Sequence, residues 1–325
     1  MELICPAGTP SAFRGAVDAG ADAVYCGFRN ETNARNFPGL NFSPEELAGS
    51  IAYGKAHGVH TYVALNTFMR AGAEQIWYEG VDTAVQLGAD ALIVADIALM
   101  AYVAERHPQQ RLHASVQASA SNADAVNFLV ESFGVKRLVL PRVLTVTDIA
   151  TLAPKVACEL EVFAFGGLCV MAEGRCSLSS YATGQSPNMQ GVCSPASHVH
   201  YREDGADMVS ELGGYTINRF GPGEAAGYPT LCKGRFHIAD DDGYAFEDPT
   251  SLDVMEHLDA LTAAGVVALK IEGRQRGKAY VAEVVSRLRQ ALAATPQDRP
   301  AILSQLRRLS EGQQTTAGAY EKKWR

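Results

Sequence analysis

Four cysteines fall in or at the start of one irregular stretch of this chain, and they are the strongest chemical signal in the sequence. They are Cys169, Cys176, Cys193 and Cys232, with 6, 16 and 38 residues between successive members. Thiolates are soft ligands that suit iron–sulfur clusters and zinc. Structural zinc sites usually contain cysteine pairs about two to four residues apart, and these four include no such pair. The spacing therefore favours a four-iron four-sulfur cluster over zinc or unrelated buried thiols.

Two histidines close behind the third cysteine keep a mixed Cys/His zinc site open. His198 and His200 stand in the run SHVH, although hairpin side chains that face solvent explain them more simply. The other three cysteines fall in apolar runs: Cys5, Cys26 and Cys158. An odd total of seven cysteines in a chain without an export signal makes disulfides the weakest explanation.

Size and charge narrow the class of protein. The chain has 325 residues, 47% of them hydrophobic, which is enough for one large α/β barrel or two ordinary domains. It begins MELICPAG, without the regions of a signal peptide, and has no long apolar run. We therefore expect a soluble cytoplasmic protein without a transmembrane segment. The net charge is −8 and basic residues are scattered except in the final EKKWR, so nucleic acid is not an expected partner.

A helix end, a glycine and a short apolar strand recur together along the chain, as in DAGADAVYCG, QLGADALIVAD and AAGVVALKIEG. The glycine suits the left-handed position after a helix. This conformation is predicted at Gly20, Gly58, Gly88 and Gly134. The pattern predicts eight strands, at 2–6, 22–26, 60–66, 91–96, 111–117, 137–141, 159–165 and 266–272, with helical periodicity in most of the gaps.

Eight strands that alternate with helices are the number found in a (β/α)8 TIM-type barrel, which is an α/β fold. A doubly wound open sheet gives the same local signals, so the count decides the prediction. The segment 167–262, between the seventh strand and the eighth, is rich in turn signals and predicts hairpins over the face where barrel active sites form. We expect a single barrel domain over 1–325, with a cluster-binding insertion at 167–262 and a C-terminal tail at 294–325.

Polar residues at or just past the predicted strand ends are candidates for substrate chemistry. Side chains alternate along a strand, so Lys270 and Glu272 are expected to face the barrel interior rather than the outer helices. The catalytic candidates are Arg142, Glu272, Lys270 and Gln117. The substrate-binding candidates are Arg35, Asn66 and Arg274. Arginine side chains suit a carboxylated ligand, although each residue could instead pair with a neighbour or cap a helix.

Two further polar residues are weaker candidates. Asp96 also stands at a predicted strand end. Arg175 lies between two of the cysteines and is expected to hydrogen-bond their loop. Gly166, Gly167 and Gly174 flank the first cysteine, and we expect them to keep the backbone slim beside a bulky cluster.

The run from Glu161 to Ser179, EVFAFGGLCVMAEGRCSLS, resembles the signature of the collagenase-like peptidase family. The glutamate, phenylalanine, glycines, both cysteines and final serine stand at the family's spacings. Gly167 departs from the family's usual Ser or Ala, but a smaller residue should not remove a ligand. The likeness covers nearly the whole chain, including ETNARNFPGLNF, SVQASASN, SPNMQGVCSPA, EAAGYPTLCKGRF, ALKIEGRQRGKAYV and SEGQQTTAGAY.

Within that family the chain is similar to members that act in oxygen-independent ubiquinone synthesis. The resemblance implies a heterodimer with a paralogous subunit and hydroxylation of a ubiquinone precursor without dioxygen. It implies prephenate as the small-molecule oxygen donor and a quinone precursor that a lipid-binding carrier could deliver. It also implies a [4Fe-4S] cluster held by Cys169, Cys176, Cys193 and Cys232.

Three other functions stay open. A cysteine peptidase needs a thiolate activated by histidine; Cys5 and Cys26 end predicted strands and could face the mouth, but no histidine lies in a mouth loop of the barrel core. The metalloprotease string H-E-x-x-H is absent. RNA base hydroxylation, which other family members perform, is disfavoured by the acidic charge. A role in assembly or electron transfer, with a cluster that never contacts substrate, is not separable from catalysis by sequence.

Overall fold

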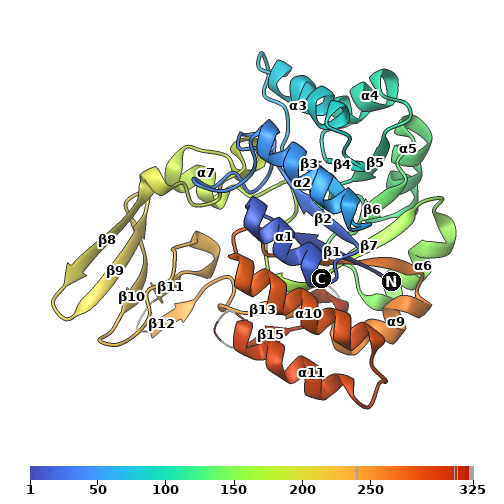
Figure 1. Cartoon of the computed structure of the whole chain (residues 1–325). Helices are drawn as coiled ribbons and strands as arrows, with labels where there is room; N and C mark the ends of the chain where they lie inside the picture. The colour runs from blue at the N-terminus through green and yellow to red at the C-terminus, as the bar shows by residue number, and fades with distance from the viewer. Residues whose placement is uncertain (239–240, 311, 313, 322–325) are drawn as a thin grey trace.

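The computed structural model describes residues 1–238, 241–310, 312 and 314–321, and its centre is a closed barrel of parallel strands (Figure 1). The strands are β1 (Glu2–Pro6), β2 (Ala23–Cys26), β3 (His60–Leu65), β4 (Ala91–Val94), β5 (Arg111–Ala114), β6 (Arg137–Val139), β7 (Glu159–Gly167) and β14 (Val266–Ile271). They follow one another in sequence order, and β14 closes the ring by pairing in parallel with β1 and β7. The predicted (β/α)8 barrel is confirmed, and every predicted strand is present with shifts only at its ends.

Helices cover the outside of the barrel (Figure 1). They are α1 (Pro10–Asp18), α2 (Pro44–Ala56), α3 (Gln75–Gln86), α4 (Ile97–Arg106), α5 (Ala123–Phe133), α6 (Val146–Leu152), α9 (Leu258–Ala263) and α10 (Lys278–Ala293). Local signals fix their starts; Ser43 and Glu46, for example, form a capping box on α2. The four glycines predicted to be left-handed have φ values of 98°, 71°, 83° and 69° in chain order, which confirms that prediction.

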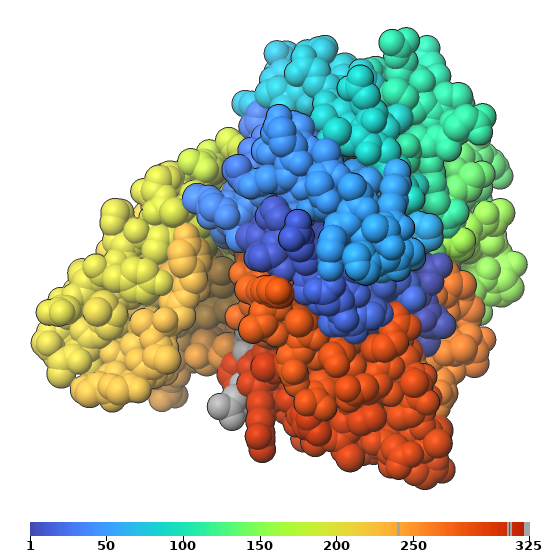
Figure 2. Space-filling view, in the orientation of Figure 1, coloured from blue at the N-terminus to red at the C-terminus, as the bar shows by residue number. Residues whose placement is uncertain are grey.

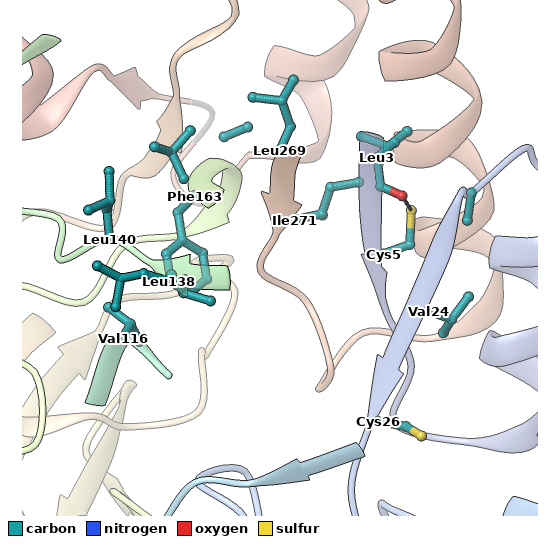
Figure 3. Packing of buried hydrophobic residues seen from close by; sticks show 14 of the residues in the cluster. Leu3, Cys5, Val24, Cys26, Val116, Leu138, Leu140, Phe163, Leu269 and Ile271 are labelled. Atoms are coloured by element: carbon teal, nitrogen blue, oxygen red, sulfur yellow. Dashed lines mark hydrogen bonds between the residues drawn. The ribbon is translucent and has the colours of Figure 1, made fainter. Parts of the chain in front are cut away.

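Side-chain alternation divides the buried residues of the barrel into two layers. One layer lies between the strands and the helices, and Figure 3 shows part of it around Leu3, Cys5, Val24 and Cys26. The other fills the barrel interior and contains Ile4, Ala23, Tyr25, Tyr62, Ala64, Ala91, Ile93 and Ala268. Because Cys5 and Cys26 belong to the outer layer and are fully buried, the expectation that they could face the mouth is wrong.

Between β7 and β14 the chain leaves the barrel and builds a lobe that projects to one side (Figures 1 and 2). Two short helices open it, α7 (Leu178–Thr183) and α8 (Pro187–Gln190). A three-stranded antiparallel sheet and a hairpin follow: β8 (Val199–Asp204), β9 (Asp207–Leu212), β10 (Tyr215–Phe220), β11 (Arg235–Ile238) and β12 (Asp241–Tyr244). The antiparallel pairing agrees with the predicted turns. Residues 239 and 240 of the predicted insertion lie outside the described residues.

The chain returns to the barrel through β13 (Ser251–Asp253), which pairs antiparallel with the end of β7. After α10, α11 (Arg299–Leu306) packs beside that helix, and β15 (Thr315–Thr316) pairs in parallel with β13. Residues 311, 313 and 322–325 of the predicted tail lie outside the described residues. Within the part of the chain that is described, no helix has the length and apolar character needed to cross a bilayer.

Candidate functional site

The polar residues singled out at strand ends surround one cavity at the carboxyl-terminal mouth of the barrel. Its lining includes Arg35, Asn66, Gln117, Arg142, Lys270, Glu272 and Arg274. The cavity measures about 30 Å³, which is room for roughly two water molecules. A larger ligand therefore requires side chains to move. The structure brings all seven side chains together, and their individual roles stay predictions.

Asn66 holds the loop that follows β2 against the mouth. Its Oδ1 accepts a hydrogen bond from the backbone N–H of Ala34 at 2.9 Å, and its Nδ2 donates to the Ser115 hydroxyl at 3.3 Å. The same hydroxyl accepts from the backbone N–H of Gln117. Asn66 thus joins three segments of the mouth and places Arg35, the next residue after Ala34, over the cavity.

Arg35 and Glu272 form an ion pair across the mouth, with Nε of the arginine 3.2 Å from Oε1 of the glutamate. Burial would raise the pKa of Glu272, but the guanidinium groups of Arg35, Arg274 and Arg142 outweigh it and hold the pKa below its usual value. The carboxylate is therefore ionised in a site where cations outnumber it.

Arg142 connects the barrel to the loop between the first two insertion cysteines. Its backbone N–H and its Nε both donate to Oε1 of Glu173, at 3.0 and 3.2 Å. Both side chains are buried, and the guanidinium also stacks over the Phe163 ring, 4.7 Å from its centroid. This buried pair anchors the cysteine loop on the cavity wall.

Lys270 reaches the cavity from inside the barrel, as predicted from strand alternation. Its Nζ lies 2.7 Å from Oε1 of Glu161 and 4.0 Å from the centroid of the Tyr25 ring. Burial lowers the pKa of Lys270, and Glu161 opposes that shift. Glu161 also lies 3.4 Å from the buried guanidinium of Arg137, so charge continues from the cavity down the barrel axis.

Arg274 is a buried cation with hydrogen-bonding capacity to spare. Its side chain is 4% exposed, and one terminal nitrogen donates to Oδ1 of Asn33 at 3.1 Å. Its Nε has no hydrogen-bond partner in the described structure. A buried donor without a partner is costly, so Arg274 is suited to an anionic ligand in the cavity.

The four insertion cysteines are half-buried in the described structure. Burial raises the pKa of Cys232 to about 12, and charges on Cys169, Cys193 and Cys176 add to the increase. Burial also raises the pKa of Cys193, where Arg35 acts in the opposite direction. The thiols are thus within electrostatic range of one another, and their role as ligands of one common group stays a prediction.

The four insertion cysteines offer thiolate donors to a metal centre. No three His, Cys, Asp or Glu side chains within the described ranges are placed to hold a single metal ion. Four thiolates are the donor set of a four-iron four-sulfur cluster and also of many structural zinc sites. The chemistry of the donor set fits the predicted cluster, and the choice between the two metals stays a prediction.

The histidines give no support to the mixed zinc alternative. Nδ1 of His198 lies 3.0 Å from the Ser197 hydroxyl, and His200 is exposed on β8. Arg175 donates to the carbonyl of Gly174 at 2.8 Å, within the cysteine loop, as expected. Asp96 instead caps α4 by accepting from the backbone N–H groups of Ala98 and Leu99.

Two glycines near the cysteines approach the backbone of the mouth loops closely. A Cβ on Gly166 would lie 2.0 Å from the carbonyl oxygen of Glu272, and one on Gly174 would lie 2.5 Å from that of Gln117. This contact excludes a side chain at both positions, and the expected place of the glycines beside a cluster stays a prediction. Both have positive φ values, 116° and 67°.

Sequence reasoning missed three residues that hold the site. Glu173 and Glu161 pair with Arg142 and Lys270, and Tyr25 lies under Lys270. A signal existed for the two glutamates, because each is an acid in an otherwise apolar or glycine-rich stretch. Tyr25 looks like any strand aromatic and carried no such signal.

An α/β barrel whose seventh strand leads into a four-cysteine insertion over the mouth defines the class of this protein. The family model for Peptidase family U32 matches residues 8–323. The chain belongs to that family, and the collagenase-like resemblance is confirmed at this level.

Several relatives carry names that describe RNA chemistry or proteolysis. The tRNA hydroxylation protein P of Escherichia coli (strain K12) is 32% identical over an alignment of 318 positions that covers 92% of this chain and 69% of the relative. The 23S rRNA 5-hydroxycytidine C2501 synthase of the same strain is 30% identical, covering 92% of this chain but 40% of the relative. The collagenase of Porphyromonas gingivalis is 27% identical, covering 90% and 66%.

A solved structure, that of the U32 peptidase Mk0906, is also similar. It aligns with a TM-score of 0.42 at 16% identity over 50% of this chain and 68% of that chain.

Proposed function

We propose that this chain is the iron–sulfur subunit of an oxygen-independent hydroxylase. One observation carries the proposal: Arg35 joins the two halves of the site. Its guanidinium pairs with Glu272 in the cavity, and the backbone N–H of the next residue, Asn36, donates to the carbonyl of Gly191, two residues before Cys193, at 3.2 Å. A group held by the cysteines would therefore lie beside any ligand in the cavity.

The proposed metal ligands are Cys169, Cys176, Cys193 and Cys232, and the proposed cofactor is a [4Fe-4S] cluster. When bound, such a cluster supplies one-electron redox chemistry. Arg35, Arg142 and Arg274 would bind and orient a carboxylated oxygen donor such as prephenate. Glu272 would keep Arg35 in place, and Lys270 would hold a proton at Nζ against Glu161.

The proposed acceptor is the ring of a ubiquinone precursor, and the proposed partner is a paralogous subunit in a heterodimer. The resemblance of stretches such as ETNARNFPGLNF, EAAGYPTLCKGRF and ALKIEGRQRGKAYV to members that act in ubiquinone synthesis supports this branch of the family. Replacing a ring C–H bond by C–OH removes two electrons from the ring, so the donor that loses its oxygen atom must take up two electrons. A cytoplasmic location and delivery of the precursor by a lipid-binding carrier belong to the same proposal.

RNA base hydroxylation is the second candidate, because relatives at 30–32% identity carry names of tRNA and rRNA hydroxylation. The formal charge of −8 argues against a phosphate backbone as ligand. Proteolysis is disfavoured because Cys5 and Cys26, the nucleophile candidates, are fully buried away from the mouth.

Deletion of the gene, followed by anaerobic growth, tests the proposal. We expect hydroxylated ubiquinone intermediates to disappear and modified RNA nucleosides to stay unchanged by mass spectrometry. Complementation by the Cys158→Ala variant should restore ubiquinone, whereas Cys193→Ala should not. Normal anaerobic ubiquinone in the deletion strain would reject the quinone role, and loss of a hydroxylated nucleoside would favour the RNA alternative.

A further inference from the structure

A second hollow lies on the other side of the loop that carries Arg35. We call this space, between residues 31–38 and 185–197, the outer groove; its volume is about 370 Å³. That volume is within the range of small-molecule sites, roughly 300 to 1,000 Å³. The outer groove is thus much roomier than the cavity inside the mouth.

The outer groove and the inner cavity share one wall. Arg35 lines the cavity, while the next residue, Asn36, lines the groove. The backbone N–H of Asn36 donates to the carbonyl of Gly191 at 3.2 Å, which fastens the wall to the insertion. Val192, beside Cys193 in the chain, also lines the groove. A ligand in the groove would therefore lie next to the loop that carries Arg35 and next to the segment that carries Cys193.

The lining of the groove is neutral. Three side chains are amides, from Asn36, Gln185 and Gln190, and the described lining residues include neither lysine nor arginine. Its acid, Glu31, is already paired with Arg70 at 2.5 Å. A phosphate or carboxylate would find no cation here. Amides and a serine suit hydroxyl and carbonyl groups instead.

Apolar surfaces complete the groove. Pro38 and Pro195 come from its two sides, and Val192 and Ala196 lie on the insertion side. Apolar side chains with a few polar groups placed among them are typical of sites for small molecules. The composition thus separates this groove from the cationic cavity, which suits an anion.

We propose that the outer groove binds the neutral aromatic ring that is to be hydroxylated, a phenol-type ring with an apolar substituent, while the anionic donor occupies the inner cavity. This assignment rests on the proposed function and adds where each of the two reactants binds. It also favours a quinone precursor over RNA, because a polynucleotide would place phosphates along a groove that offers them no cation.

Ala196→Trp tests the assignment, because Ala196 is exposed and a tryptophan there would fill the groove without disturbing the core. Ala301→Trp, at an exposed position on α11, is the matched control. The probe is a phenol with a short isoprenoid chain, added to the anaerobically purified protein with its co-purifying partner. Binding is followed by saturation-transfer NMR, and iron content is measured in every sample.

We expect Ala196→Trp to weaken binding of the phenol at least tenfold with unchanged iron content, and Ala301→Trp to bind as the parent does. Absence of phenol binding to the parent, or equal binding by both variants, would overturn the assignment. Binding of a tRNA that Ala196→Trp abolishes would assign the groove to RNA instead. If Ala196→Trp hydroxylates the phenol with an unchanged KM, the proposed function stands and the groove assignment is rejected. If the parent binds the phenol in the groove but does not hydroxylate it, the groove assignment stands and the proposed function is rejected.

Discussion

Arg35 and Glu272 meet across the barrel mouth, Nε to Oε1 at 3.2 Å, with 24% and 14% of their side chains exposed. They are 237 residues apart in the chain, one in the loop after β2 and the other just past β14. The pair ties two ends of the barrel together and places a guanidinium on the wall of the cavity. Glu272 balances only part of the positive charge that Arg35, Arg142 and Arg274 bring to the site.

Glu272→Gln should lower both stability and activity. The amide keeps the shape but leaves Arg35 without a carboxylate in a mostly buried site, at a cost of about 2 kcal/mol or more in the free energy of unfolding. Urea denaturation measures this loss. The control is Glu283→Gln, which breaks an exposed pair on α10 (Arg287–Glu283) and should cost under about 0.5 kcal/mol. Equal losses in the two variants would contradict the role given to the mouth pair.

Lys270→Met should destabilise the protein strongly, because it leaves the carboxylate of Glu161 buried with Arg137 as its remaining cationic neighbour. Breaking a buried pair from one side costs about 3–5 kcal/mol. Adding Glu161→Gln to Lys270→Met should recover part of the loss, and a double-mutant cycle from denaturation curves measures the coupling. Strict additivity of the two single losses would show that the 2.7 Å contact does not couple these residues.

His113 should make stability depend on pH. Burial lowers its pKa well below the usual 6.5, and Arg137, Arg111 and Lys270 add to the shift. Below about pH 6.5 the unfolded chain binds a proton at this imidazole that the folded protein does not bind. The contribution of His113 to the free energy of unfolding is therefore complete above that pH and falls by up to about 1.4 kcal/mol per pH unit as the pH decreases.

Comparison with His113→Gln isolates this effect. The difference in unfolding free energy between the parent and the variant should shrink steadily from pH 7.5 to pH 5. His200→Gln, at an exposed histidine on β8, serves as the control. A constant difference between the parent and His113→Gln across that range would contradict the assignment.

Gly166→Ala should damage the site more than its size suggests. The new Cβ would lie 2.0 Å from the carbonyl oxygen of Glu272, at a φ of 116°, so the backbone that positions Glu272 must shift. Gly39→Ala is the control, since Gly39 also has a positive φ, 78°, but nothing within 4 Å of the added atom. We expect a loss of about 1–2 kcal/mol for Gly39→Ala from conformation alone, and a clearly larger loss for Gly166→Ala in thermal unfolding. Similar losses would mean that the close approach is unimportant.

The barrel was predictable from sequence because each unit carries its own local signals. A glycine such as Gly88 ends a helix, and an apolar run such as ALIVA follows as a strand. Polar residues at strand ends were also found, because a closed parallel barrel brings all strand ends to one mouth. Position along the chain was enough to place Arg142 and Glu272 near each other.

The internal partners were not predictable, because they depend on distances that the sequence does not contain. Lys270 pairs with Glu161 across 109 residues, and Glu173 reaches Arg142 only because the insertion folds back over the mouth. For the same reason the close approach of Gly166 and Gly174 to the backbone of the mouth loops was not predicted. The orientation of Cys5 and Cys26 was also open, since alternation leaves two choices and apolar contexts fit both.

Metal analysis of anaerobically purified protein tests the central claim most directly. We predict a brown protein with about four iron and four sulfide per chain, in which Cys232→Ser lowers the iron content sharply. Cys158→Ser, at a cysteine outside the mouth, should retain the parent's iron content. Zinc in place of iron, or an iron content unchanged by Cys232→Ser, would contradict the account.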